Sequence, residues 1–70
     1  MNQKKLAKLI KEAFESVDTK LIVDRIIERT TDCALNYTRK TGRYPTVNQI
    51  RAWIYNIHVS EINRGSKLLS

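Results

Sequence analysis

The sequence feature that most constrains this fold is the turn over residues 41–46, which reads Thr-Gly-Arg-Tyr-Pro-Thr and holds the single proline of the chain. Gly42 suits the left-handed conformation that closes a helix, and Pro45 keeps the residue before it out of helical geometry. The sequence Thr-Val-Asn-Gln that follows has the form of a capping box, in which the Thr46 hydroxyl accepts a hydrogen bond from the Gln49 amide. We therefore expect one helix to end just before Gly42 and another to begin at Thr46.

Apolar residues recur every three or four positions in three stretches, which is the spacing of one buried helix face. The first stretch covers about residues 3–16, the second covers about residues 19–40, and the third begins at Thr46. No repeat, low-complexity tract or strand-like alternation appears in the sequence. The pattern predicts a compact, small all-α domain of three helices, with residues 1–70 as a single domain.

The end of the third stretch leaves two alternatives open. One helix can run unbroken to Asn63 and stop at Gly65, or it can end near Asn56 and restart at His58 or Val59 as a fourth helix. Two helices in this region would favour a DNA reader. One long helix would favour a scaffold or an adaptor.

The short chain limits what the domain can bury. A domain of this size buries only about 60% of its unfolded surface, so support from a partner subunit is expected, and we expect a homodimer. The single cysteine, Cys33, rules out an internal disulfide and fits a reducing cytosol. No apolar run approaches the roughly 20 residues of a membrane span, and Leu9-Ile10 is too short for a signal-peptide core, so we expect a cytoplasmic protein.

The net charge of +6 is unevenly placed along the chain. Residues 1–20 carry +2, residues 21–37 carry −1 and residues 38–70 carry +5, and no acidic residue lies between Asp32 and Glu61. Charge of this sign favours a nucleic acid or an anionic membrane surface as partner, although a solvated basic surface also keeps a small protein soluble. The acid-free basic turn beside a capped helix start makes a polyanion the expected partner.

The candidate contacts follow from this charge pattern. The cations expected to hold phosphates are Arg39, Lys40 and Arg43, with Lys4, Lys5 and Lys8 as a second basic group. Further candidates, for contact with a groove or with the backbone, are Arg51, Asn63, Arg64 and Lys67. Tyr44, beside the proline, is a candidate for stacking on a base, whereas Trp53 has the spacing of a core residue.

Enzyme chemistry finds little support in the sequence. The one histidine, His58, and Cys33 lie on different predicted helices, with no third partner implied by spacing. Asp24, Glu28 and Asp32 share a helix face, which is best explained as solvated surface relieved by neighbouring arginines. No glycine-rich phosphate loop and no metal-ligand spacing are present. We predict a protein that is not an enzyme and has no cofactor.

Residues 35–69 resemble a known family. They carry Gly-Arg-Tyr-Pro-Thr-Val-Asn-Gln-Ile from Gly42 to Ile50, then apolar positions at Ile54 and Ile62. This segment resembles the Gly-x-x-Pro-Thr-x-x-x-Ile segment of LexA-type helix-turn-helix domains, in which Pro-Thr opens a supporting helix and a further helix enters the major groove. The resemblance implies a recognition helix over about Val59 to Lys67, exposing Ser60, Glu61, Asn63, Arg64 and Lys67. The order of helices around a basic turn also resembles the histone fold, which likewise implies DNA contact.

These observations predict a small nucleic-acid-binding protein of regulatory or accessory function, with duplex DNA as the expected ligand. The first helix is basic and amphipathic, which also suits an anionic membrane or a groove in another protein. We expect its apolar face to pack on the second helix instead, and so no membrane partner. The alternative function is a small helical adaptor or inhibitor, of the kind that phages and plasmids encode, acting on a host protein through an apolar helix face.

Overall fold

The computed structural model describes residues 3–69 and, for side chains, residues 4–64. The elements are the helices α1 (Gln3–Glu15), α2 (Asp24–Thr41) and α3 (Val47–Leu69), with a 3-10 turn η1 (Thr19–Leu21) between α1 and α2. The described part of the chain contains no strand. None of its helices is both long and apolar enough to cross a bilayer. The predicted fold class, a small all-α domain with three helices, is confirmed.

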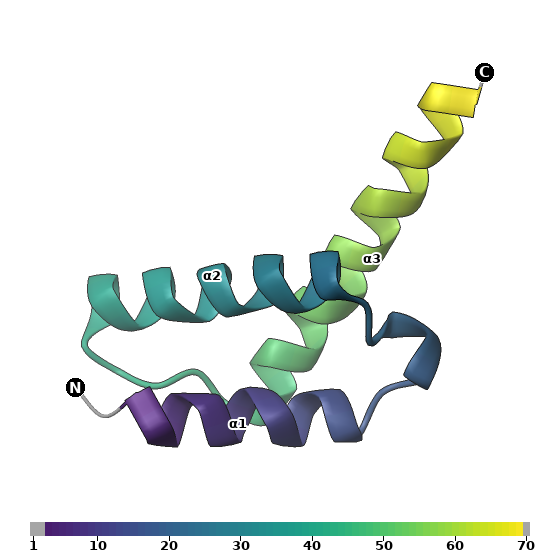
Figure 1. Cartoon of the computed structure of the whole chain (residues 1–70). Helices are drawn as coiled ribbons and strands as arrows, with labels where there is room; N and C mark the ends of the chain where they lie inside the picture. Colours follow the sequence, from purple (N-terminus) through teal and green to yellow (C-terminus); the bar gives the residue numbers. More distant parts are fainter. Residues whose placement is uncertain (1–2, 70) are drawn as a thin grey trace.

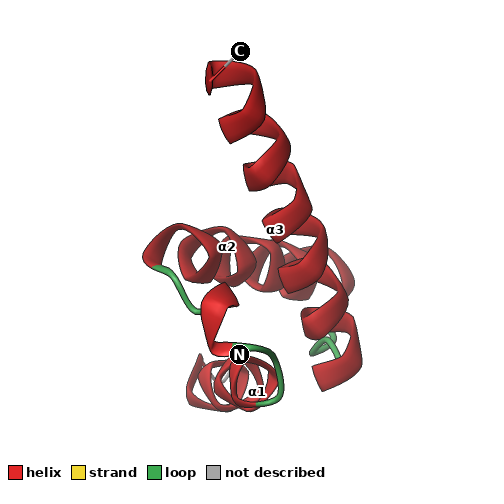
Figure 2. Cartoon of the chain, turned by 90° about the vertical axis from the view of Figure 1, so that its right-hand side faces the viewer, coloured by secondary structure: helices red, strands yellow, loops and turns green. Residues whose placement is uncertain are grey.

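The three helices form a short antiparallel pair crossed by a longer helix. α1 and α2 run in opposite directions, one above the other, and α3 crosses both of them obliquely (Figure 1). The second half of α3 extends past α2 as a projecting arm, which is also clear when the pair is seen end-on (Figure 2). The arm accounts for the elongated outline of the molecule, which measures 43 × 24 × 17 Å.

The core lies where the three helices meet. α1 contributes apolar side chains at Leu6, Ile10 and Ala13, spaced by four and three residues, and all three are buried. α3 contributes Ile50 and Ile54, which are completely buried. Seven further apolar residues border this cluster and are half-buried: Leu9, Ile27, Cys33, Leu35, Tyr44, Val47 and Trp53. The three predicted apolar stripes therefore face one another, as the helical spacing indicated.

The turn between α2 and α3 has the predicted chemistry at both ends. Gly42 has a φ of 70° in the left-handed region, and its amide donates to the Thr38 carbonyl at 2.8 Å. The Gln49 amide donates to Thr46 Oγ1 at 3.1 Å, which caps the start of α3. The left-handed Gly42 at the end of α2 and the Thr46 cap of α3 were both predicted, and both are confirmed.

The second helix begins later than predicted. The expected helix over residues 19–40 is split into η1 and α2, because Asp18 caps only one turn by accepting from the Lys20 amide at 3.0 Å. Leu21 is buried at the end of that turn, and the backbone of Val23 is then extended (φ −124°, ψ 152°). Anchoring Leu21 in the core therefore redirects the chain before α2 can start at Asp24.

The sequence left open whether the region after Thr46 forms one helix or two, and the structure shows one. It runs as one helix from Val47 to Leu69, without a break near Asn56 and without a stop at Gly65. In the described part of the chain, only glycine has positive φ, so Asn56 does not make the left-handed turn that a second helix requires. The prediction of a separate recognition helix over Val59 to Lys67, which the resemblance implied, is therefore wrong. These residues continue the helix that Ile50 and Ile54 anchor in the core.

Candidate nucleic-acid interface

The fold brings two basic groups together at one end of the molecule. Because α1 and α2 are antiparallel, the first turns of α1 lie at the same end as the last turn of α2 and the turn after it (Figure 1). A direct contact joins the two segments, since Lys5 Nζ lies 5.0 Å from the centre of the Tyr44 ring. We call this surface the basic end and define it by six residues: Lys4, Lys5, Lys8, Arg39, Lys40 and Arg43.

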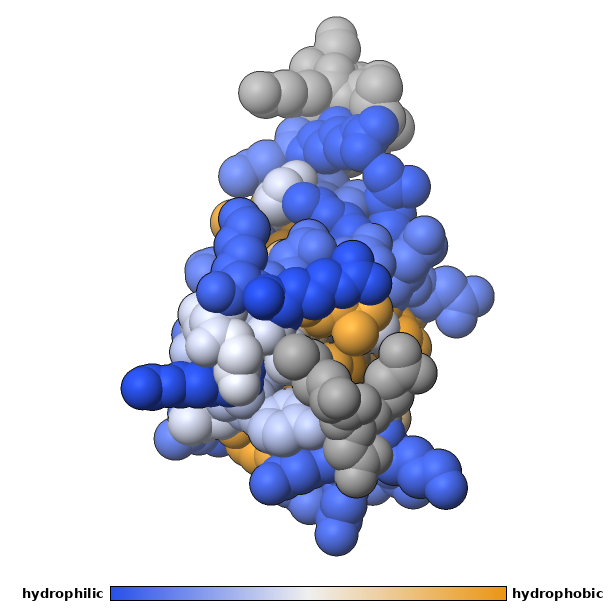
Figure 3. All heavy atoms as spheres, turned by 90° about the vertical axis from the view of Figure 1, so that its left-hand side faces the viewer, coloured by the Kyte–Doolittle hydropathy of each residue, from blue (hydrophilic) through white to orange (hydrophobic). Residues whose placement is uncertain are grey.

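All six side chains of the basic end are exposed. Glu61 pairs with Arg25 and Arg29, and neither of these ion pairs involves Lys5, Lys8 or the three cations of residues 39–43. The view onto this end shows strongly hydrophilic side chains predominating on its surface (Figure 3). Like charges gathered on one surface produce a positive potential that attracts a polyanion.

The backbone beneath the basic end is held by local hydrogen bonds. The Thr41 hydroxyl donates to the Tyr37 carbonyl at 2.8 Å and accepts from the Arg43 amide at 3.1 Å. Pro45 is buried and Tyr44 is half-buried, so the turn is anchored on its inner side. The backbone that carries the cations of this turn is therefore held in place. Tyr44 was expected to stack on a base, and the ammonium of Lys5 covers one face of its ring.

The remaining predicted contacts lie apart from the basic end or are less accessible. Arg51 is half-buried, and its Nε is buried without a hydrogen-bond partner in the described part of the chain. Asn63 and Arg64 are exposed on the projecting arm of α3, which points away from the basic end. Lys67 lies outside the residues whose side chains are described. The structure thus joins seven of the eleven predicted residues, the six cations of the basic end and Tyr44, into one surface, and leaves Arg51, Asn63 and Arg64 out of it.

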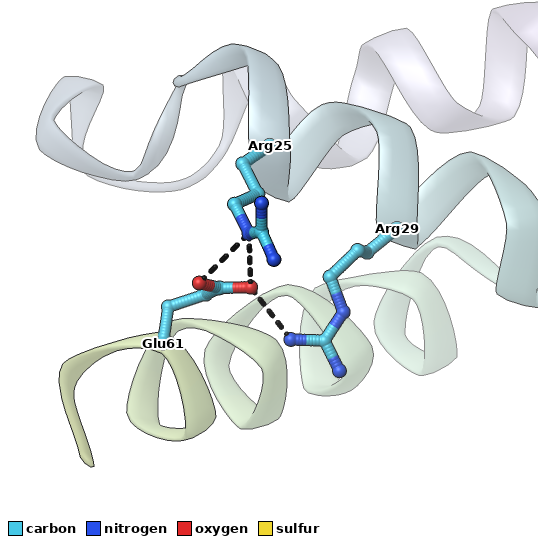
Figure 4. A network of polar contacts seen from close by, with 3 residues as sticks. All are labelled: Arg25, Arg29 and Glu61. Carbon is cyan, nitrogen blue, oxygen red and sulfur yellow. Dashed lines mark hydrogen bonds and ion pairs between the residues drawn. The ribbon is translucent and has the colours of Figure 1, made fainter. Parts of the chain in front are cut away.

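An ion-pair cluster that the sequence did not predict joins α2 to the base of the arm. Arg25 Nε donates to both oxygens of Glu61, at 2.9 and 3.0 Å, and Arg29 Nη1 donates to Oε1 at 2.8 Å (Figure 4). The hydrogen bonds from Arg25 and then Arg29 hold the pKa of the Glu61 carboxyl below its usual range. Glu61 was expected on the exposed face of a recognition helix, whereas its side chain is 19% exposed and turned toward α2.

The other residues that stand out in the sequence, Trp53, Cys33 and His58, are all half-buried. Trp53 packs edge-to-face on Tyr37, with ring centres 5.6 Å apart, as its core spacing predicted. Cys33 and His58 are half-buried on α2 and α3 respectively. Among the described residues, no three histidine, cysteine, aspartate or glutamate side chains lie together as metal ligands would.

No family model, no curated protein and no solved structure matches this chain. The class that the structure itself defines is a small all-α domain, in which a helix pair is crossed by a third, projecting helix.

Proposed function

We propose that this protein binds nucleic acid through the basic end, with duplex DNA as the expected ligand. It would act as a small regulatory or accessory protein without enzymatic activity, in the reducing cytoplasm that its lone cysteine suits. The observation that carries the proposal is the meeting of two basic groups, more than thirty residues apart in sequence, on one exposed surface joined by the contact of Lys5 with Tyr44.

The interactions proposed are with phosphates rather than with base edges. Arg39, Lys40 and Arg43 would bind the backbone of one strand segment, and the α1 lysines would add charge beside them. Reading of bases by a separate helix forms no part of the proposal, because α3 is continuous and Asn63 and Arg64 lie on the arm. Binding by this surface should therefore depend strongly on salt and weakly on sequence.

The test is the salt dependence of binding to two short duplexes of unrelated sequence. For the wild-type protein, we expect log affinity to fall linearly with log salt between about 50 mM and about 200 mM, with similar slopes for both duplexes. The variant R39A/K40A/R43A should show a slope that is smaller by about 0.9 for each phosphate that the protein no longer neutralises. Fluorescence anisotropy of labelled DNA gives both the affinity and the slope.

A matched variant separates this surface from general attraction by net charge. K11A/K20A/R64A removes the same number of positive charges from exposed positions outside the basic end. We expect it to keep most of the wild-type slope. If the two triple variants lose affinity equally, or if the wild-type protein shows no salt slope, the basic end is not a nucleic-acid interface.

The alternative is a helical protein-interaction module, and one observation favours it. α3 is a single helix from Val47 to Leu69, the arrangement expected of an adaptor more than of a DNA reader. An adaptor that acts through an apolar helix face should bind its partner equally well after R39A/K40A/R43A. The same variant therefore distinguishes the two functions.

A further inference from the structure

α3 carries a second apolar stripe, which begins at Tyr55, continues into the arm and does not face the core. Tyr55, Val59 and Ile62 are spaced by four and three residues, so they lie on one face of the helix. They are 45%, 55% and 52% exposed, whereas Ile50 and Ile54 on the core face are fully buried. The spacing is the one with which a helix meets another helix along a seam.

The stripe continues onto the body of the domain. Val23 and Ile62 line one hollow between the start of α2 and α3, together with the buried Ile26 and four polar residues: Lys20, Arg25, His58 and Glu61. Val23 is 47% exposed, so two large apolar side chains border this hollow in contact with water. We call Val23, Val59 and Ile62 the arm face. Contiguous exposed apolar residues of this kind usually mark an interaction surface.

The charges around the arm face indicate what can cover it. Arg25 and Arg29 share the single carboxylate of Glu61, Asp24 and Glu28 lie on the same turns of α2, and Lys20 lines the hollow, so that three positive and three negative charges lie here. The surface is therefore near charge balance, unlike the basic end. A polyanion is not attracted to it, whereas a second copy can approach it with the two basic ends kept apart.

The arm also lacks support within one chain. From Val59 to Arg64, every residue except the half-buried Glu61 is exposed, so this stretch of the arm packs little against the body. Isolated helical segments shorter than about 12–15 residues are marginal in water. A neighbouring helix along the stripe would supply the packing that holds the arm in helical form.

We propose that two copies of this chain associate through the arm face. The arms cross on a two-fold axis, and Ile62 of each copy lies against the hollow beside Val23 of the other. Because a two-fold interface uses the same patch on both copies, a single apolar stripe suffices. This inference does not depend on nucleic-acid binding, and a negative result for either leaves the other standing.

The test is the mass of the protein in solution as a function of concentration, by sedimentation equilibrium from about 1 µM to about 1 mM. We expect the wild-type mass to rise from 8.2 kDa toward twice that value. V59K/I62K should raise the dissociation constant by more than about tenfold. The matched variant N36K/N48K adds the same charge at exposed positions of α2 and of the first turn of α3, which line no hollow with the arm face, and should associate like the wild type.

A measurement on the wild-type protein alone guards against misfolded variants. Amide chemical shifts followed on dilution should move at Val23, Val59 and Ile62, and stay unchanged at the basic end. The proposal is overturned if the protein is monomeric throughout, which would leave the arm face to a different protein. It is equally overturned if dimers persist in V59K/I62K or if the shifts map to the basic end.

Discussion

Two threonines of α2 are completely buried, and their hydroxyl groups have different surroundings. Thr38 Oγ1 donates to the Ala34 carbonyl at 2.9 Å. Thr30 Oγ1 has no hydrogen-bond partner in the described part of the chain. A buried hydroxyl without a partner costs about 1–3 kcal/mol of desolvation, whereas an apolar group of the same shape costs nothing of that kind.

We therefore expect Thr30→Val to stabilise the protein, because it keeps the shape of the side chain and removes the unsatisfied hydroxyl. A gain of about 1 kcal/mol would raise Tm by roughly 4–8 °C in a domain of this size. Thermal unfolding followed by circular dichroism measures the shift. Thr38→Val is the control and should give no comparable gain, since it removes a hydrogen bond that is made. A lower Tm for Thr30→Val would show that its hydroxyl is satisfied in solution.

Gly42 gives a second prediction at the scale of one residue. Its φ is 70°, and a Cβ built there would have no heavy atom within 4 Å, so only backbone strain opposes a side chain. Gly42→Ala should lower the free energy of unfolding by about 1–2 kcal/mol, and Gly42→Asn by less, because asparagine tolerates this conformation better. Urea denaturation measures both values. Equal losses for the two variants would mean that φ is not the cause.

At the scale of the elements, Glu61 joins α3 to α2. Its carboxylate accepts from Arg25 and Arg29 across 36 and 32 residues of sequence. α3 also meets the body through the buried side chains of Ile50, Ile54 and Ile57, and the Glu61 cluster adds polar contacts between α2 and the arm.

The lowered pKa of Glu61 predicts how stability depends on pH. Because the folded-state pKa lies below the unfolded one, the contribution of Glu61 is present above the unfolded value of about 4.3 and is lost as pH falls through the folded value. Glu61→Gln should remove this part of the acid sensitivity. Urea denaturation between neutral and acidic pH measures the effect, with Glu12→Gln as an exposed-carboxylate control. If both variants keep the wild-type pH dependence, the ion pairs do not form in solution.

At the scale of the whole molecule, charge and apolar surface are separated. The basic end lies at the first turns of α1, while the arm face lies where α3 leaves α2 near its start (Figure 1). Two copies joined through their arms would therefore present two basic ends pointing outward. The salt-slope and sedimentation experiments examine different surfaces, so each proposal can fail without affecting the other.

Several features of the fold and of the proposed interface follow from the sequence alone. The end of α2 at Gly42 and the cap of α3 at Thr46 are set by backbone chemistry within a few residues. The same is true of the core stripes, since helical spacing decides which residues share a face. Arg39, Lys40 and Arg43 were found in the same way, from a local run of bases beside a turn.

Only the tertiary structure decided which distant residues meet. It placed Lys5 on Tyr44 and Glu61 between Arg25 and Arg29, and it split the second helix by burying Leu21. It also kept α3 continuous through Asn56, because the core anchors both sides of that position. Such outcomes depend on how helices cross and which side chains fill the space between them. Local spacing contains no information on these long-range pairings. The positions of the helices could therefore be predicted from the sequence, whereas the composition of the surfaces depends on how the helices pack.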